Sequence, residues 1–129
     1  MSVDSEALNS NPNLLDYDQL SIFIDVGLDE FRTIFQDVVK DVPNTLATIS
    51  NALAGGDEKT FRAQLHSLRG MLLNFGCIAI AVVLMGLEKA PELPQIAPEA
   101  LLQKLTQLWE STRAALEAWA DQAEAEGLG

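Results

Sequence analysis

The sequence predicts an all-α protein, an antiparallel four-helix bundle with a short additional N-terminal helix. Apolar residues recur at spacings of three and four through almost every segment, which is the helical rather than the strand period. Glycine- and proline-containing breaks divide most of the chain into four long segments joined by short connections. The 129 residues, 48% hydrophobic and 21% charged, can bury one core but leave little room for a second domain.

The N-terminal residues 1–16 have neither the basic nor the apolar region of a secretory signal, so we expect a loose leader there. The folded domain is then expected over residues 17–125. Its first segment, "YDQLSIFIDVG" at 17–27, predicts a short helix that Gly27 ends and that caps one end of the domain.

A first long helix is predicted from Asp29, with Pro43 expected to kink it. Its apolar positions are Phe31, Ile34, Phe35, Val38, Val39, Val42, Leu46, Ile49 and Leu53. The "AGGD" stretch at 54–57 ends this helix, and Asp57 is placed to cap a second helix that runs to about Asn74.

A third helix is predicted over residues 77–90, after a break at Gly76. It is apolar on most sides, so we expect it at the centre of the bundle. The apolar run 71–87 is shorter than the roughly 20 residues of a membrane span and contains Asn74, which favours a core helix over the alternative of a membrane-attached protein.

The fourth helix follows a connector at 90–98 that holds three of the five prolines. Its apolar spacing continues from Leu101 to Trp119, which predicts a helix to about residue 123.

Charge and cysteine content limit the classes of function. A formal net charge of -11 repels phosphate backbones, so nucleic acid is excluded as a partner. Cys77 stands alone, which allows no intrachain disulfide and too few thiol ligands for a metal site. We therefore expect a cytoplasmic protein without a bound metal or cofactor.

The only histidine lies in an unusual setting on the second long helix. Winding this helix at about 100° per residue places an apolar stripe on one side and His66 well outside it. Within roughly 60° of the histidine lie three cations, one glycine and one leucine: Lys59, Arg62, Arg69, Gly70 and Leu73.

This arrangement has two interpretations. An exposed histidine beside arginines is ordinary on a solvated helix face. However, Gly70 costs roughly 1 kcal/mol relative to Ala in mid-helix, and Leu73 is an apolar residue on the polar side. An exposed imidazole can act as a nucleophile, and a nearby guanidinium can bind a phosphoryl group, so phosphoryl transfer is the chemistry that fits.

The segment "LHSLRGMLLNFGCIAIAVVLMGLE" resembles the signature of histidine-containing phosphotransfer (HPt) domains. That signature reads H-x-L-K-G, then a glycine ten residues after the histidine, then apolar positions up to a Leu-Glu pair. The matching positions are His66, Leu68, Arg69, Gly70, Gly76, Leu87 and Glu88. The resemblance covers about residues 17–120.

The resemblance implies that His66 is phosphorylated on Nε2 and that Glu88 bonds to Nδ1 and fixes the tautomer. The alternative for Glu88 is a solvated carboxylate at a helix end. Arg69 replaces the family's lysine and keeps its charge, and Gly70 leaves room for the phosphoryl group. Met71 and Leu72 are bulkier than usual for the family, which could crowd the site.

The resemblance further implies a phosphocarrier that relays phosphoryl groups between aspartates of receiver domains, fed by a sensor or hybrid histidine kinase. The chain itself has no nucleotide-binding motif, so no kinase activity is expected. Mg²⁺ would belong to the receiver, and the carrier is expected to be a monomer.

The receiver is expected to contact Lys59, Arg62 and Leu73. The alternative is a non-phosphorylated helical adaptor that binds a partner through the same face.

Overall fold

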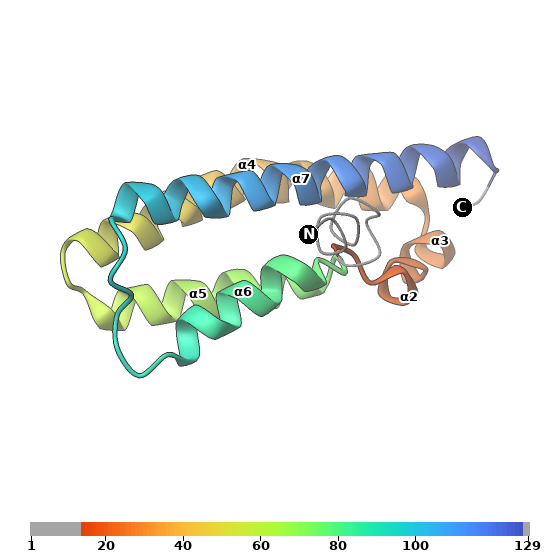
Figure 1. Cartoon of the computed structure of the whole chain (residues 1–129). Helices are drawn as coiled ribbons and strands as arrows, with labels where there is room; N and C mark the ends of the chain where they lie inside the picture. Colours follow the sequence, from red (N-terminus) through yellow and green to blue (C-terminus); the bar gives the residue numbers. More distant parts are fainter. Residues whose placement is uncertain (1–13, 128–129) are drawn as a thin grey trace, which may run out of the picture.

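Four long helices lie side by side in the computed structural model, which describes residues 14–127 (Figure 1). The helices of this part of the chain are α2 (Tyr17–Leu20), α3 (Ile22–Val26), α4 (Leu28–Ala54), α5 (Glu58–Leu73), α6 (Ile78–Lys89) and α7 (Pro98–Ala125). These residues form no strand. Short connections make successive long helices antiparallel, as in an up-and-down bundle.

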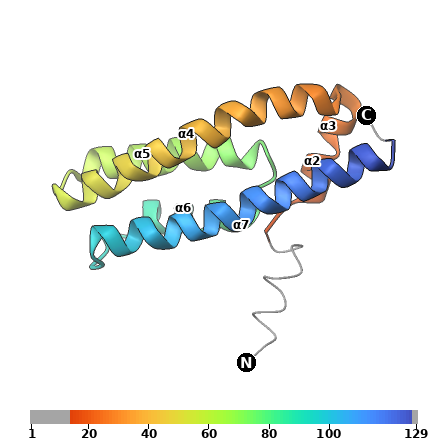
Figure 2. The same ribbon diagram turned by 90° about the horizontal axis from the view of Figure 1, so that it is seen from above.

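The long helices differ in length, and this shapes the molecule. α4 and α7 pack against each other, and α5 packs against both α4 and α6. α4 and α7 extend beyond the turn between α5 and α6, and α2 and α3 lie at that end (Figures 1 and 2). The predicted all-α bundle is confirmed, with the expected N-terminal helix divided into two short helices at Ser21.

The N-terminal boundary of the domain lies earlier than the sequence predicts. Leu14 and Leu15 are buried in the core. The amide of Asp16 donates to the Gly76 carbonyl at 2.7 Å, and its carboxylate accepts from the first amides of α2. Residues 14–16 therefore belong to the domain, because their apolar side chains close its end. Residues 1–13 of the predicted leader lie outside the described residues.

The predicted helix ends of α4 and α5 agree with the structure. α4 begins after Gly27, at φ 120°, and continues through Pro43. The Asp57 carboxylate accepts from the Thr60 amide at 3.1 Å and caps α5. Hydrogen bonding to Thr60 lowers the pKa of Asp57, since these bonds favour the charged carboxylate.

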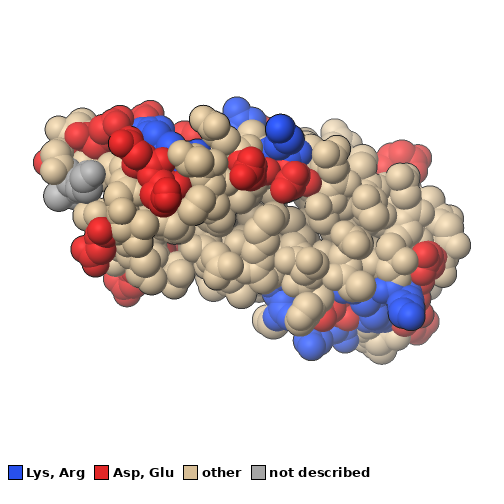
Figure 3. Space-filling view, turned by 180° about the vertical axis from the view of Figure 1, so that it is seen from behind, with Lys and Arg blue, Asp and Glu red and all other residues tan. Residues whose placement is uncertain are grey.

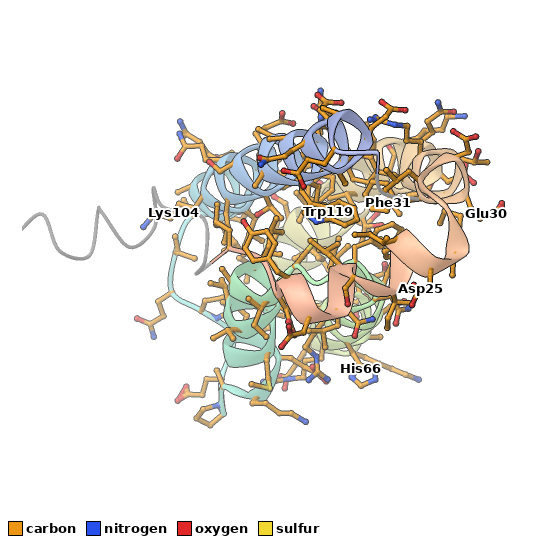
Figure 4. All side chains as sticks on the ribbon, turned by 90° about the vertical axis from the view of Figure 1, so that its right-hand side faces the viewer. Asp25, Glu30, Phe31, His66, Lys104 and Trp119 are labelled. Atoms are coloured by element: carbon orange, nitrogen blue, oxygen red, sulfur yellow. The ribbon has the colours of Figure 1, made fainter. Side chains whose placement is uncertain are left out.

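The core is built from one face of each long helix. The apolar stripe predicted for the second helix is buried: Phe61, Leu65, Leu68, Leu72 and Phe75. From α4 and α7, Phe31 and Trp119 point toward each other, with ring centroids 5.2 Å apart in an edge-to-face contact (Figure 4). Burial raises the pKa of the Cys77 thiol to about 12, which keeps it protonated and unreactive.

The prediction that the third helix lies at the centre of the bundle is wrong. Only Ile80, Ala81 and Leu84 of α6 are buried, and four apolar side chains are exposed. These are Ile78, Val82, Val83 and Met85. α6 occupies one corner of the bundle, packed closely on α5 and weakly on α7, so its outer face has no covering helix. Within residues 14–127 no helix is long and apolar enough to cross a membrane.

Candidate functional site

His66 lies on the side of α5 that faces away from the bundle, and its side chain is 65% exposed (Figure 4). The orientation follows from helix geometry, because the neighbouring positions Leu65 and Leu68 point into the core. Both polar contacts that the structure shows for the ring involve Nδ1. Nε2 is the ring nitrogen left for an external partner.

Glu88, in the last turn of α6, provides one of these contacts. Its Oε2 lies 3.0 Å from Nδ1 of His66, and its side chain is only 13% exposed. The alternative of a freely solvated carboxylate at a helix end is therefore wrong. The antiparallel packing of α5 on α6 brings together two residues that are 22 positions apart in the sequence.

Arg69 provides the second contact. Its Nη2 lies 2.9 Å from Nδ1 of His66 and 3.1 Å from Oε1 of Glu88. The contact with Glu88 is an ion pair by distance only, since Oε1 accepts no well-oriented hydrogen bond. The Arg69 side chain is 18% exposed, so the guanidinium beside the imidazole is largely shielded from solvent.

Nδ1 cannot satisfy both neighbours at once. A protonated Nδ1 donates to Glu88 and leaves the lone pair on Nε2, whereas an unprotonated Nδ1 accepts from Arg69 and leaves the proton on Nε2. Only the first tautomer has a nucleophilic Nε2. The relative positions of Glu88 and Arg69 therefore control which ring nitrogen can react.

The two other predicted cations of this face behave differently from each other. Arg62 is partly buried, with Nε donating to Glu58 at 2.9 Å and Nη1 donating to the backbone carbonyl of Glu88. Lys59 is exposed, and the described residues offer it no ion pair. Only Lys59 is thus fully available to a partner.

Gly70 and Leu73 are both exposed beside His66, as predicted. A Cβ atom built on Gly70 would meet no atom within 4 Å, so packing within the domain does not require glycine there. Leu73 is 39% exposed at the end of α5.

Met71 and Leu72 lie away from the histidine. Leu72 is fully buried in the core, and Met71 is partly buried on the side of α5 that faces α4, where it lines a shallow pocket with Asp41 and Gln64. Neither side chain crowds His66. The expectation of crowding is wrong because successive helical residues differ by about 100° in direction.

Charge is unevenly distributed over the surface. Lysine and arginine side chains gather where α5 and α6 lie, at the lower right in Figure 3, while acidic side chains gather at the opposite end. Four of the eight cations belong to these two helices: Lys59, Arg62, Arg69 and Lys89. Among residues 14–127 no group of three or more His, Cys, Asp or Glu side chains could hold a metal ion.

An all-α bundle that presents one imidazole on an outer helix face, backed by a carboxylate and a guanidinium, is the class of protein defined by this fold and site. The chain belongs to the Hpt domain family, whose family model matches residues 33–126. The chain has no significant match among curated proteins or among solved structures. Hpt domains act in histidine phosphotransfer in two-component signalling and interact there with receiver domains and histidine kinases.

The outer face of α6 is the part of this surface that the sequence analysis missed. Ile78, Val82 and Met85 fall within an arc of roughly 60° whose centre lies about 90° from Glu88 around α6. Because α5 and α6 are antiparallel, Leu73 lies toward the start of α6, where this row begins. No signal in the sequence identifies the exposed side of a helix that is apolar all round.

Proposed function

We propose that this chain is a phosphocarrier in which Nε2 of His66 accepts a phosphoryl group from an aspartyl phosphate of one receiver domain and passes it to the aspartate of another. In each acceptance the Nε2 lone pair forms a bond to phosphorus, and the phosphorus–oxygen bond to the aspartate breaks and releases a carboxylate. The observation that carries the proposal is the exposed imidazole whose Nδ1 contacts Glu88.

Glu88 and Arg69 have complementary roles in this proposal. Glu88 accepts the Nδ1 proton, which keeps the lone pair on Nε2 and stabilises the ring when the new bond places positive charge on it. Arg69 already touches the imidazole, so its guanidinium can rotate toward phosphoryl oxygens as negative charge collects there. Gly70 leaves space beside the ring for the phosphoryl group and the receiver.

The receiver would supply Mg²⁺ and the acidic residues that hold it. The proposed docking surface consists of Lys59, Leu73 and the exposed row Ile78, Val82 and Met85. An apolar centre with a cation at its edge matches a partner whose active site is acidic. The carrier would act as a cytoplasmic monomer without kinase activity of its own.

The adaptor hypothesis has lost its main support. It relied on the bulk of Met71 and Leu72, and these side chains do not lie beside His66. The exposed apolar row is compatible with either function, so phosphorylation decides between them.

The test is phosphoryl transfer to His66→Gln from receiver domains of the source organism that a histidine kinase has labelled with radioactive phosphate. The native chain should gain an acid-labile, base-stable label and His66→Gln should gain none. Ser67→Ala, a neighbouring exposed position on the other side of α5, serves as the matched control and should be labelled normally.

His66→Gln should fold normally, as measured by circular dichroism, because the side chain is mostly exposed. A label on this variant would overturn the assignment of His66. A native chain that binds receivers but takes no label from any of them would support the adaptor.

A further inference from the structure

Glu88 lies in the last turn of α6, where few hydrogen bonds within the helix hold the backbone. α6 ends at Lys89, and the chain then enters the proline-containing connector at 90–97. The last four carbonyls of a helix have no partner within the helix, and the Glu88 carbonyl is one of them. The amide of Ala90 donates to Gly86 and closes the final turn. A helix end of this kind frays readily unless another element holds it.

Arg62 is the residue that holds it. From one turn before His66 on α5, its Nη1 donates to the Glu88 backbone carbonyl, and its Nε donates to Glu58 at 2.9 Å. The Glu58 contact is within α5, so it fixes the direction of the guanidinium without involving α6. Arg62 therefore joins the helix that carries the imidazole to the backbone of the residue that orients it.

The chemistry of this contact favours a lasting attachment. A guanidinium places positive charge at a helix C-terminus, where the partial charge of the helix is negative, and it satisfies a carbonyl that would otherwise need water. The Arg62 side chain is 25% exposed, compared with 55% for Glu58, so it is partly shielded from competing solvent. Lys59, three residues earlier, makes no such contact with α6.

We infer that Arg62 is a positioning residue, which clamps the last turn of α6 onto α5 and thereby keeps the Glu88 carboxylate against Nδ1 of His66. This positioning role differs from the docking role that the sequence suggested for Arg62. The inference rests on the proposed function for its purpose, but the clamp itself can be measured without any phosphoryl transfer.

The experiment compares Arg62→Met, which replaces the aliphatic stem of the side chain but removes its donors and charge, with Lys59→Met, which removes the same charge from the same helix. Two NMR measurements on the full chain report the clamp. The ¹⁵N spectrum of His66 gives the fraction of the tautomer protonated on Nδ1, and amide hydrogen exchange at Ala90 gives the opening of the last turn.

In Arg62→Met we expect the Nδ1-protonated fraction to fall and the Ala90 amide to exchange about tenfold faster. Arg62→Lys should restore part of both effects, since one ammonium can reach one acceptor. Lys59→Met should leave both measurements at native values. Native values in Arg62→Met would overturn the clamp, and weaker receiver binding as the sole defect would identify Arg62 as a docking residue instead.

The proposed function can fail separately. A native chain that takes no label on His66 would contradict the phosphocarrier role, while a shift in tautomer and exchange in Arg62→Met would still establish the clamp.

Discussion

At the scale of single residues, the reactivity of His66 depends on two neighbours that compete for one nitrogen. Glu88 and Arg69 both contact Nδ1, at 3.0 and 2.9 Å, and each favours a different tautomer. Exposure of the imidazole alone would not select Nε2 as the nucleophile. The mostly buried carboxylate of Glu88 makes that selection possible, because it accepts the proton from Nδ1.

Gly70 gives a prediction at this scale. It begins the last turn of α5 with open space around its Cα, so Gly70→Ala should stabilise the fold by up to about 1 kcal/mol through helix propensity. The same methyl group lies beside His66 and should slow phosphoryl transfer from the receiver. Thermal unfolding and transfer kinetics measure the two effects.

Gly86 provides the matched control. It is also exposed at the start of a last turn, that of α6, with no atom within 4 Å of a Cβ, but it lies roughly 160° from Glu88 around the helix. Gly86→Ala should stabilise the fold equally and leave transfer unchanged. Equal transfer rates in both variants would remove Gly70 from the site.

At the scale of elements, α6 contributes to the core, the site and the surface because it occupies a corner of the bundle. Its inner face supplies Ile80 and Leu84 to the core, its final turn supplies Glu88 to the site, and its outer face stays apolar and uncovered. Large exposed apolar rows are uncommon on the surface of a monomer and typical of binding surfaces.

The outer face of α6 leads to a second prediction. Val82→Asp should weaken binding to the receiver about tenfold, because it places a charge in the apolar centre of the proposed contact. Val83→Asp is the control, since Val83 is also exposed but lies roughly 100° from Val82 around α6, outside this row. Binding titrations of both variants test the face, and equal losses would show that this row is not the contact.

At the scale of the whole molecule, residues 14–16 connect the end of the bundle to the turn between α5 and α6. Gly76 has φ 69°, and its carbonyl accepts from the Asp16 amide at 2.7 Å. A Cβ on Gly76 would lie 2.7 Å from the Asp16 carbonyl oxygen, a backbone atom that cannot move independently. The close approach therefore requires glycine.

Gly76→Ala should accordingly destabilise the fold more than Gly56→Ala. Both glycines have a left-handed φ, but a Cβ on Gly56 would meet nothing within 4 Å. The loss in free energy of unfolding should be about 2 kcal/mol larger for Gly76→Ala, which is the cost of the clash alone. Chemical denaturation measures it, and equal losses would mean that Asp16 can move aside at little cost.

The sequence by itself determined the helical class, the buried stripe of α5 and the outward direction of His66. These features depend on spacings of three and four within one helix, so local geometry is sufficient to predict them. The Glu88 contact was expected from a family resemblance rather than from any local pattern.

Only the tertiary structure decided the remaining features of the site. The partial burial of Arg69, the contact between Arg62 and the Glu88 carbonyl, and the uncovered face of α6 depend on how two helices align and on which corner each occupies. The physical reason is that interhelical alignment results from the packing of all four long helices together, and a residue's own neighbours in the sequence do not encode it.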